Sequence, residues 1–239
     1  MDWFDDHWMF LAPPLTFMLL IVKYVILAPQ SGEKKDPRLQ ELLMWGWLSL
    51  FMYSFHQFEE HGYDLYGRRY HFIEYLNEMK PLGIVMEKRY ITYINVLQVH
   101  VFFGLYAWYA EKTGNPLLAV LNNSLSALNA LMGHILPAVF KQAYNPGLLQ
   151  SIFMAPIAIR VIHKYYQYTG KSGMAVVLCV IFGSVYGHVI MLLLPVKLVN
   201  MGYFADTGYL LWTTGAAAFY PVFANAVLGS ASSDKARVE

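Results

Sequence analysis

Seven long apolar stretches constrain the fold of this 239-residue chain more than any other feature. A helix needs about 20 consecutive, mainly apolar residues to cross the hydrocarbon core of a bilayer. The stretches cover residues 8–27, 41–60, 90–110, 116–140, 147–163, 174–194 and 209–228. Because these stretches use most of the chain, the sequence predicts an all-α fold, a polytopic membrane bundle of about seven transmembrane helices.

Composition supports a single membrane domain. The chain is 57% hydrophobic and 14% charged, whereas soluble domains carry about 25% charged residues. We expect one domain over residues 1–230 and a polar tail over 231–239. The first apolar stretch follows Asp2, Asp5 and Asp6, which favours a retained span over a cleaved signal peptide. The net charge of +1 and the lack of a basic run argue against nucleic acid as a partner.

Basic residues in the connections predict the orientation of a multi-pass protein. Cytoplasmic loops carry an excess of lysine and arginine, which favours a cytoplasmic C-terminus. The residues that favour it are Lys34, Lys35, Arg38, Arg160, Lys164, Lys171, Lys235 and Arg237. Five basic residues in the segment 62–89 would then lie on the other side. This segment mixes aromatic and charged residues, which predicts an interfacial helix that could form a lid.

Prolines mark several expected helix boundaries. Pro116 and Pro146 are expected at the starts of the fourth and fifth spans, and Pro195 at the end of the sixth. Pro221 falls inside the seventh, where a proline can kink a helix.

Ionisable residues cluster at the end of the second stretch, in the run His56, Glu59, Glu60, His61 and Gly62. On a helix Glu59 and Glu60 lie three and four positions after His56, so the three share a face, and Gly62 favours a helix end. Ionisable groups in a membrane are costly and are usually functional. A bound cation, or protons, would relieve the repulsion between the two carboxylates. Imidazole and carboxylate ligands suit iron, manganese or zinc.

Histidines of other stretches are expected at a similar depth. His134 and His188 lie toward the ends of alternate spans, and His100 lies somewhat deeper. The sequence therefore predicts metal ligation by His56, Glu59, Glu60 and His134, with His100, His188 and His61 as further candidates, and catalytic roles for Glu59 and Glu60. For the last three histidines, hydrogen bonding between helices or a charge at a helix end remains an alternative.

Residues 41–165 resemble a family of membrane proteins named for its HxxEE motif. The matching residues are His56, Glu59 and Glu60, then Asn129 with His134, then the run from Tyr144 to Gly147. The resemblance implies an enzyme, with no particular reaction. In the family pattern the asparagine precedes the histidine by four positions, whereas here the spacing is five. Asn129 would therefore reach the site only if its helix bulges, for example near Gly133. Tyr144 belongs first to a Pro-Gly turn, from which it could also reach the site.

The favoured function is a membrane metalloenzyme that oxidises an apolar or lipid-like substrate at an iron centre, by hydroxylation or desaturation, with an electron donor as partner. With zinc, the same ligands would suit hydrolysis of a lipid ester or amide. A metal-free membrane protease and a transporter of protons or metal ions remain alternatives.

Overall fold

The computed structural model describes residues 2–27, 36–79, 83–170 and 172–228, and these residues are helical with no strand. This confirms the all-α prediction. The expected tail at 231–239 and the basic residues Lys34, Lys35 and Lys171 lie outside the described residues, so they are not discussed further.

Each of the seven apolar stretches forms a continuous helical run, and several runs contain a π-helical segment, here labelled η. The runs are α2 (Trp8–Ile21) with η1 (Val22–Leu27); α3 (Pro37–Gln57) with η3 (Phe58–Gly62); α5 (Lys88–Tyr93), η5 (Ile94–Phe103) and α6 (Gly104–Thr113); α7 (Leu117–Leu128), η6 (Asn129–Ile135) and α8 (Leu136–Lys141); α9 (Leu148–Thr169); α10 (Gly173–Val185), η7 (Tyr186–Leu193) and α11 (Leu194–Asn200); and α12 (Asp206–Leu228). Two short helices, α1 (Asp2–Asp5) and α4 (His71–Met79), complete the described fold.

Proline positions agree with the prediction except at one place. Pro116 is the N-cap residue of α7, and Pro221 lies inside α12. The prediction that Pro195 ends the sixth helix was wrong, because the helical run continues through α11 to Asn200. Pro195 stands in the first turn of α11.

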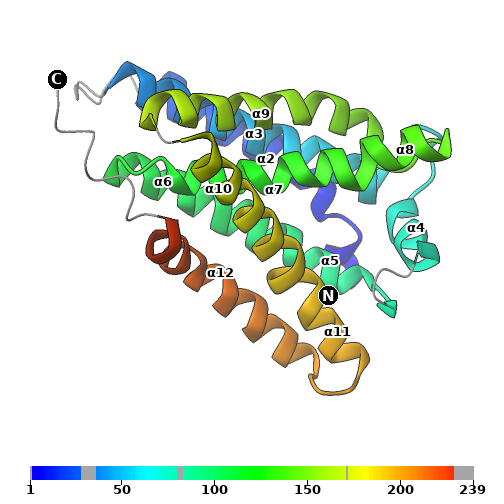
Figure 1. Ribbon diagram of the computed structural model, residues 1–239. Coiled ribbons are helices and arrows are strands. Elements are labelled where there is room, and N and C mark those ends of the chain that lie inside the picture. The colour runs from blue at the N-terminus through cyan, green and yellow to red at the C-terminus, as the bar shows by residue number, and fades with distance from the viewer. Residues whose placement is uncertain (1, 28–35, 80–82, 171, 229–239) are drawn as a thin grey trace.

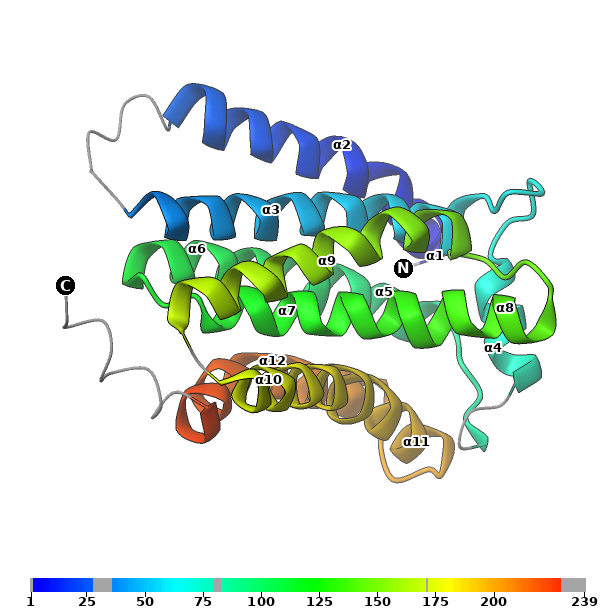
Figure 2. The same ribbon diagram turned by 45° about the horizontal axis from the view of Figure 1, so that its top comes forward.

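The helices pack lengthwise around α7. Nearly every residue of α7 is buried, and α7 packs against α3, α6, α9, α10 and α12. Figure 2 shows α2 along one side of the bundle and α10 with α12 along the opposite side. Helix α4 lies at one end of the bundle, near α8 (Figure 1). An interfacial helix in the segment 62–89 was expected, and α4 is the helix found there.

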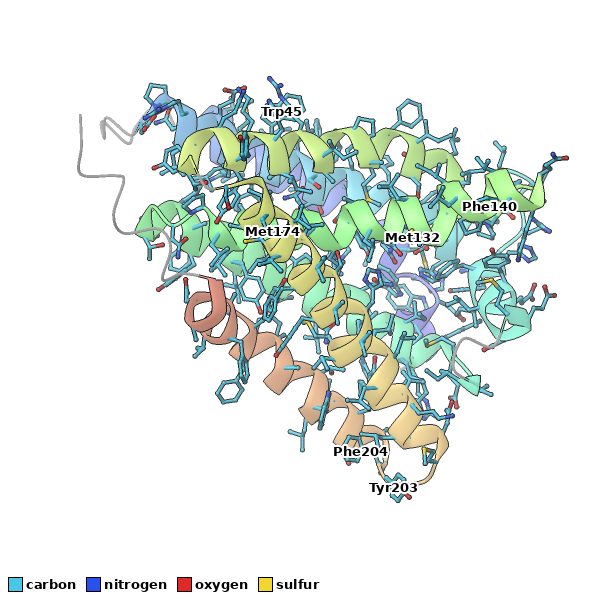
Figure 3. The ribbon with its side chains drawn as sticks, in the orientation of Figure 1. Trp45, Met132, Phe140, Met174, Tyr203 and Phe204 are labelled. Carbon is cyan, nitrogen blue, oxygen red and sulfur yellow. The ribbon has the colours of Figure 1, made fainter. Side chains whose placement is uncertain are left out.

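Three helical runs are long and apolar enough to cross a membrane: Trp8–Ile26, Lys88–Thr113 and Gly173–Asn200. Large apolar side chains are also exposed on the outer faces of other helices, such as Phe153 on α9 and Leu211 on α12. An apolar exterior of this kind suits lipid and not water. Phe140 and Tyr203, labelled in Figure 3, are largely exposed near helix ends. The chain is therefore membrane-associated, and the number of crossings and the side of the C-terminus stay predictions.

Candidate metal site

Three of the predicted ligands meet inside the bundle. His56 on α3, Glu60 on η3 and His134 on η6 are almost fully buried. One oxygen of Glu60, Oε1, lies 3.3 Å from His56 Nε2 and 3.1 Å from His134 Nε2. Each residue offers a ligand atom, and the three atoms lie within 4.8 Å of one another. This group could hold a metal ion.

Asn129 reaches the group because its helix is π-helical. A π-helix bonds residue i to residue i+5, and η6 spans Asn129–Ile135. Residues five apart, such as Asn129 and His134, therefore face the same side. The side-chain nitrogen of Asn129 donates to His56 Nε2 at 3.1 Å. The five-residue spacing between Asn129 and His134 thus fits the site, because η6 is the helix bulge expected near Gly133.

Neighbouring acceptors determine which imidazole nitrogen carries the proton. His56 Nδ1 donates to the Gly147 carbonyl at 3.2 Å, and His134 Nδ1 donates to Asn145 Oδ1 at 2.8 Å. Asn145 also donates to the His134 carbonyl, which fixes the orientation of its amide. A neutral imidazole has one N–H, so both Nε2 atoms are acceptors: His56 Nε2 accepts from Asn129, and His134 Nε2 faces Glu60. Histidines that bind metals commonly have this arrangement.

Two atoms at the centre of the group lack a hydrogen bond. Glu60 Oε1 and His134 Nε2 are buried and have no hydrogen-bond partner, although they lie only 3.1 Å apart. Both are acceptors, so neither can satisfy the other. A buried unsatisfied polar group costs about 1–3 kcal/mol. A cation or a proton between these atoms would remove that cost.

Gly147, the N-cap residue of α9, lies directly against the three ligands. Its φ is +90°, in the left-handed region that favours glycine. A Cβ at this position would lie 2.7 Å from His134 Cε1, 2.8 Å from His56 Cε1 and 2.9 Å from Glu60 Cγ. Only glycine therefore fits this position. The Tyr-x-Pro-Gly run was interpreted first as a turn, and the turn also brings the backbone against all three ligands.

Glu59, a predicted ligand, lies outside this group. Its carboxylate accepts hydrogen bonds from the backbone N–H groups of Leu149 and Gln150 at 3.1 and 2.7 Å, and from the Tyr144 hydroxyl at 2.9 Å. The first turn of α9 carries unsatisfied N–H groups and partial positive charge, which favour a carboxylate. Glu59 therefore joins α9 to η3, and Tyr144 reaches the site through Glu59.

Two further residues bind the second oxygen of Glu60. Gln57 Nε2 donates to Oε2 at 2.8 Å, and His61 Nε2 lies 3.4 Å from the same atom. Both side chains are buried. The two oxygens of Glu60 therefore have different neighbours. Oε1 faces His56 and His134, whereas Oε2 faces Gln57 and His61.

His100 and His188 lie apart from the three ligands. His100 Nδ1 donates to the Asn95 carbonyl at 2.7 Å, and its Nε2 lies 3.0 Å from Ser54 Oγ. Both of its nitrogens therefore have polar partners outside the metal group. His188 Nδ1 donates to the Ser184 carbonyl at 2.9 Å, which leaves its Nε2 available.

A large cavity opens beside Glu60, and we call it the site cavity. Its volume is about 410 Å³, within the usual range for small-molecule sites. Most of its wall is apolar and comes from α4, η5, η6 and η7, with Leu128 of α7 and Met86 before α5; Phe72, Met132 and Met191 are further examples. Met132, labelled in Figure 3, is 58% exposed and lies at the rim. The polar lining includes Gln57, Glu60, His61, Asn129 and His188.

Three residues that contact the group were not predicted from the sequence: Asn145, Gln57 and Ser151, whose Oγ lies 3.3 Å from His56 Nδ1. Asn145 lies in the Tyr-x-Pro-Gly run at the variable position, and Gln57 lies inside the HxxEE motif. Buried amides are rare away from polar partners, so their place within the two motifs was the available signal.

Comparison with known proteins finds a protein family that matches part of the chain. No curated protein and no solved structure matches the chain. Residues 47–161 match the family described as "protein of unknown function with HXXEE motif". This range contains the three ligands, Asn129 and the run from Tyr144 to Gly147, which confirms the resemblance found in the sequence. Residues 47–161 are therefore similar to the HXXEE family.

Proposed function

We propose that the protein is a membrane metalloenzyme in which His56, Glu60 and His134 bind one metal ion. The observation that carries the proposal is the pair Glu60 Oε1 and His134 Nε2, buried 3.1 Å apart, in which neither atom satisfies the other while His134 is neutral. A metal ion, or a proton on His134, would satisfy both atoms. Asn129, which donates to His56 Nε2, would give up that bond when the metal binds.

Iron-dependent oxidation of an apolar substrate is the favoured reaction. Two histidines and one carboxylate with open positions are the ligand set of non-haem Fe(II) oxygenases. Such iron activates oxygen toward C–H bonds. In support, Glu60 borders a cavity whose wall is mainly apolar, which would hold a hydrocarbon chain beside the metal. The reaction would need a separate electron donor and would yield a hydroxylated or desaturated product.

Zinc-dependent hydrolysis is the second candidate, and the same ligands support it. Two histidines with one glutamate also form catalytic zinc sites, where the metal activates a bound water. Glu59 is a weaker candidate for a catalytic base in either reaction, because α9 and Tyr144 already bind both of its oxygens.

Elemental analysis of the purified protein in detergent tests the proposal. We expect close to one equivalent of metal in the wild type, with iron favouring oxidation and zinc favouring hydrolysis. His134→Gln and Glu60→Gln should each lose the metal. His100→Gln is the matched control, because it removes a half-buried histidine whose nitrogens already have partners. A wild type without metal, or a His134→Gln variant that keeps it, would contradict the proposal.

A further inference from the structure

The side of the site cavity next to Glu60 has a free hydrogen-bond acceptor. Gln57 Oε1 is buried without a partner, although the Gln57 side chain lines the cavity and is only 1% exposed. The Nε2 of the same amide donates to Glu60 Oε2 at 2.8 Å. Reversing the amide would place its oxygen against a carboxylate, so the orientation is fixed. The free atom is therefore an oxygen that needs a donor.

His61 supplies a second free atom on the same side of Glu60. Its Nδ1 is buried without a partner, and its side chain also lines the site cavity. Its Nε2 faces Glu60 Oε2 at 3.4 Å, and the Asn95 amide is 3.5 Å from the same nitrogen. Unlike His56 and His134, His61 has no acceptor at Nδ1, so its proton is assigned to Nε2, which faces the Glu60 carboxylate; the long contact from Asn95 Nδ2 is then not a hydrogen bond. Nδ1 is then another acceptor.

The charges along the cavity indicate which head group would fit there. No lysine, arginine or aspartate of the described residues lines the cavity, and Glu60 is its one carboxylate. A phosphate or carboxylate would lie beside Glu60 without a cation from the protein, which is costly at low dielectric. An ammonium group would compete with the proposed metal for Glu60. An uncharged donor, such as a hydroxyl or an amide N–H, has neither problem.

We infer that the substrate is a lipid with an uncharged head group that donates a hydrogen bond to Gln57 Oε1 or His61 Nδ1. Its hydrocarbon chain lies along the apolar wall formed by α4, η5 and η7. This inference rests on the proposed function, because it names the substrate class of the same site. The head group would then lie next to Glu60, on the side opposite His56 and His134.

Binding of matched ligands tests the inference. We would reconstitute the wild type into phosphatidylcholine nanodiscs and measure its affinity for 1-dodecanol, dodecanamide and dodecyl methyl ether. The ether has a similar chain and an oxygen but no donor. We expect the alcohol or the amide to bind about tenfold more tightly than the ether, as for one hydrogen bond to a buried acceptor. Equal affinities for all three would overturn the inference, since water would then satisfy the free acceptors.

Variants of the cavity residues test which side chains cause the preference for ligands that donate a hydrogen bond. Gln57→Met has a similar volume but no amide, and His61→Phe keeps an aromatic ring, so each should reduce the preference for donors. Asn123→Leu is the matched control, because Asn123 Oδ1 is also buried without a partner but lines a different, small cavity. An undiminished preference in both Gln57→Met and His61→Phe would overturn the inference. If these variants fail to fold, the ligand series on the wild type still decides it.

Metal content of the same samples separates the two proposals. A preference for donor ligands in a protein without metal would support the substrate class and contradict the metalloenzyme. Bound metal without any preference among the ligands would contradict the substrate class alone. Dodecyl phosphate should bind more weakly than the alcohol, and tighter binding of the phosphate would contradict the argument from charge.

Discussion

Two cavities of the bundle each border a histidine, but only one has the features of a reactive site. The site cavity borders Glu60 and His188. The second cavity, here called the α2 cavity, has a volume of about 240 Å³, lies along α2 and borders His100. His100 has a polar partner at each nitrogen, whereas Glu60 Oε1 and His134 Nε2 have none. A histidine inside the bundle is thus weak evidence for chemistry, and an unsatisfied one is much stronger.

The largest effect is expected from a methyl group at Gly147. Gly147→Ala should abolish metal binding, because its Cβ would come within 2.9 Å of all three ligands and its φ is +90°. Gly104→Ala is the control, since its Cβ would lie 4.0 Å from Leu50 beside the α2 cavity. A helical Gly→Ala change commonly stabilises by about 0.5–1 kcal/mol. Elemental analysis measures the metal content of the two variants, and thermal unfolding measures their stability. A Gly147→Ala protein that keeps its metal would show that the site cavity is not next to a metal site, and the two cavities would no longer differ.

Metal removal should distinguish the role of His134 from that of His100. A chelator should lower the unfolding temperature of the wild type, because a ligand that binds only the folded state contributes about 2.7 kcal/mol at a concentration of 100 Kd. His100→Gln should show the same decrease, and His134→Gln should show none. Differential scanning fluorimetry in detergent measures the change. A chelator effect that persists in His134→Gln would place the metal elsewhere.

A smaller effect is expected at Tyr144, which contacts the site only through Glu59. Tyr144→Phe removes one of three hydrogen bonds to this carboxylate, whereas the N–H groups of Leu149 and Gln150 remain. We expect a loss of about 1 kcal/mol in the free energy of unfolding and unchanged metal content. Loss of the metal in this variant would show that Glu59 belongs to the metal site after all.

The smallest effect is expected far from both cavities, at the start of α3. Asp36 caps α3 by accepting from the backbone N–H of Arg38 at 2.8 Å. The hydrogen bond from the Arg38 side chain lowers the pKa of Asp36 below its usual value. This contribution to stability is therefore present above the ordinary aspartate pKa and is lost as the pH falls through the lowered value. Asp36→Ala should cost about 0.5 kcal/mol, at the lower end of the range for N-caps because the Asp36 side chain is partly exposed. Denaturation at neutral pH measures the loss, and the variant should be less sensitive to acid.

Local sequence patterns were sufficient for much of the fold and for part of the site. Each of the seven apolar stretches is helical, because hydrophobic length and helix-ending residues act locally. Gly62 ends η3 as expected. His56 and Glu60 are four apart, so their proximity also follows from helix geometry. Pro195 was misplaced because a proline in a first helical turn is compatible with continuation of the run.

What the sequence by itself determined is an all-helical, lipid-compatible chain with a His/Glu cluster at the end of α3. Only the tertiary structure decided which of the two adjacent carboxylates meets His134. The N-terminus of α9 binds Glu59 and the packing of η6 brings His134 to Glu60, and both contacts join residues more than 70 positions apart in the chain. Periodicity describes one helix at a time, whereas the partner of a buried charge depends on how separate helices pack.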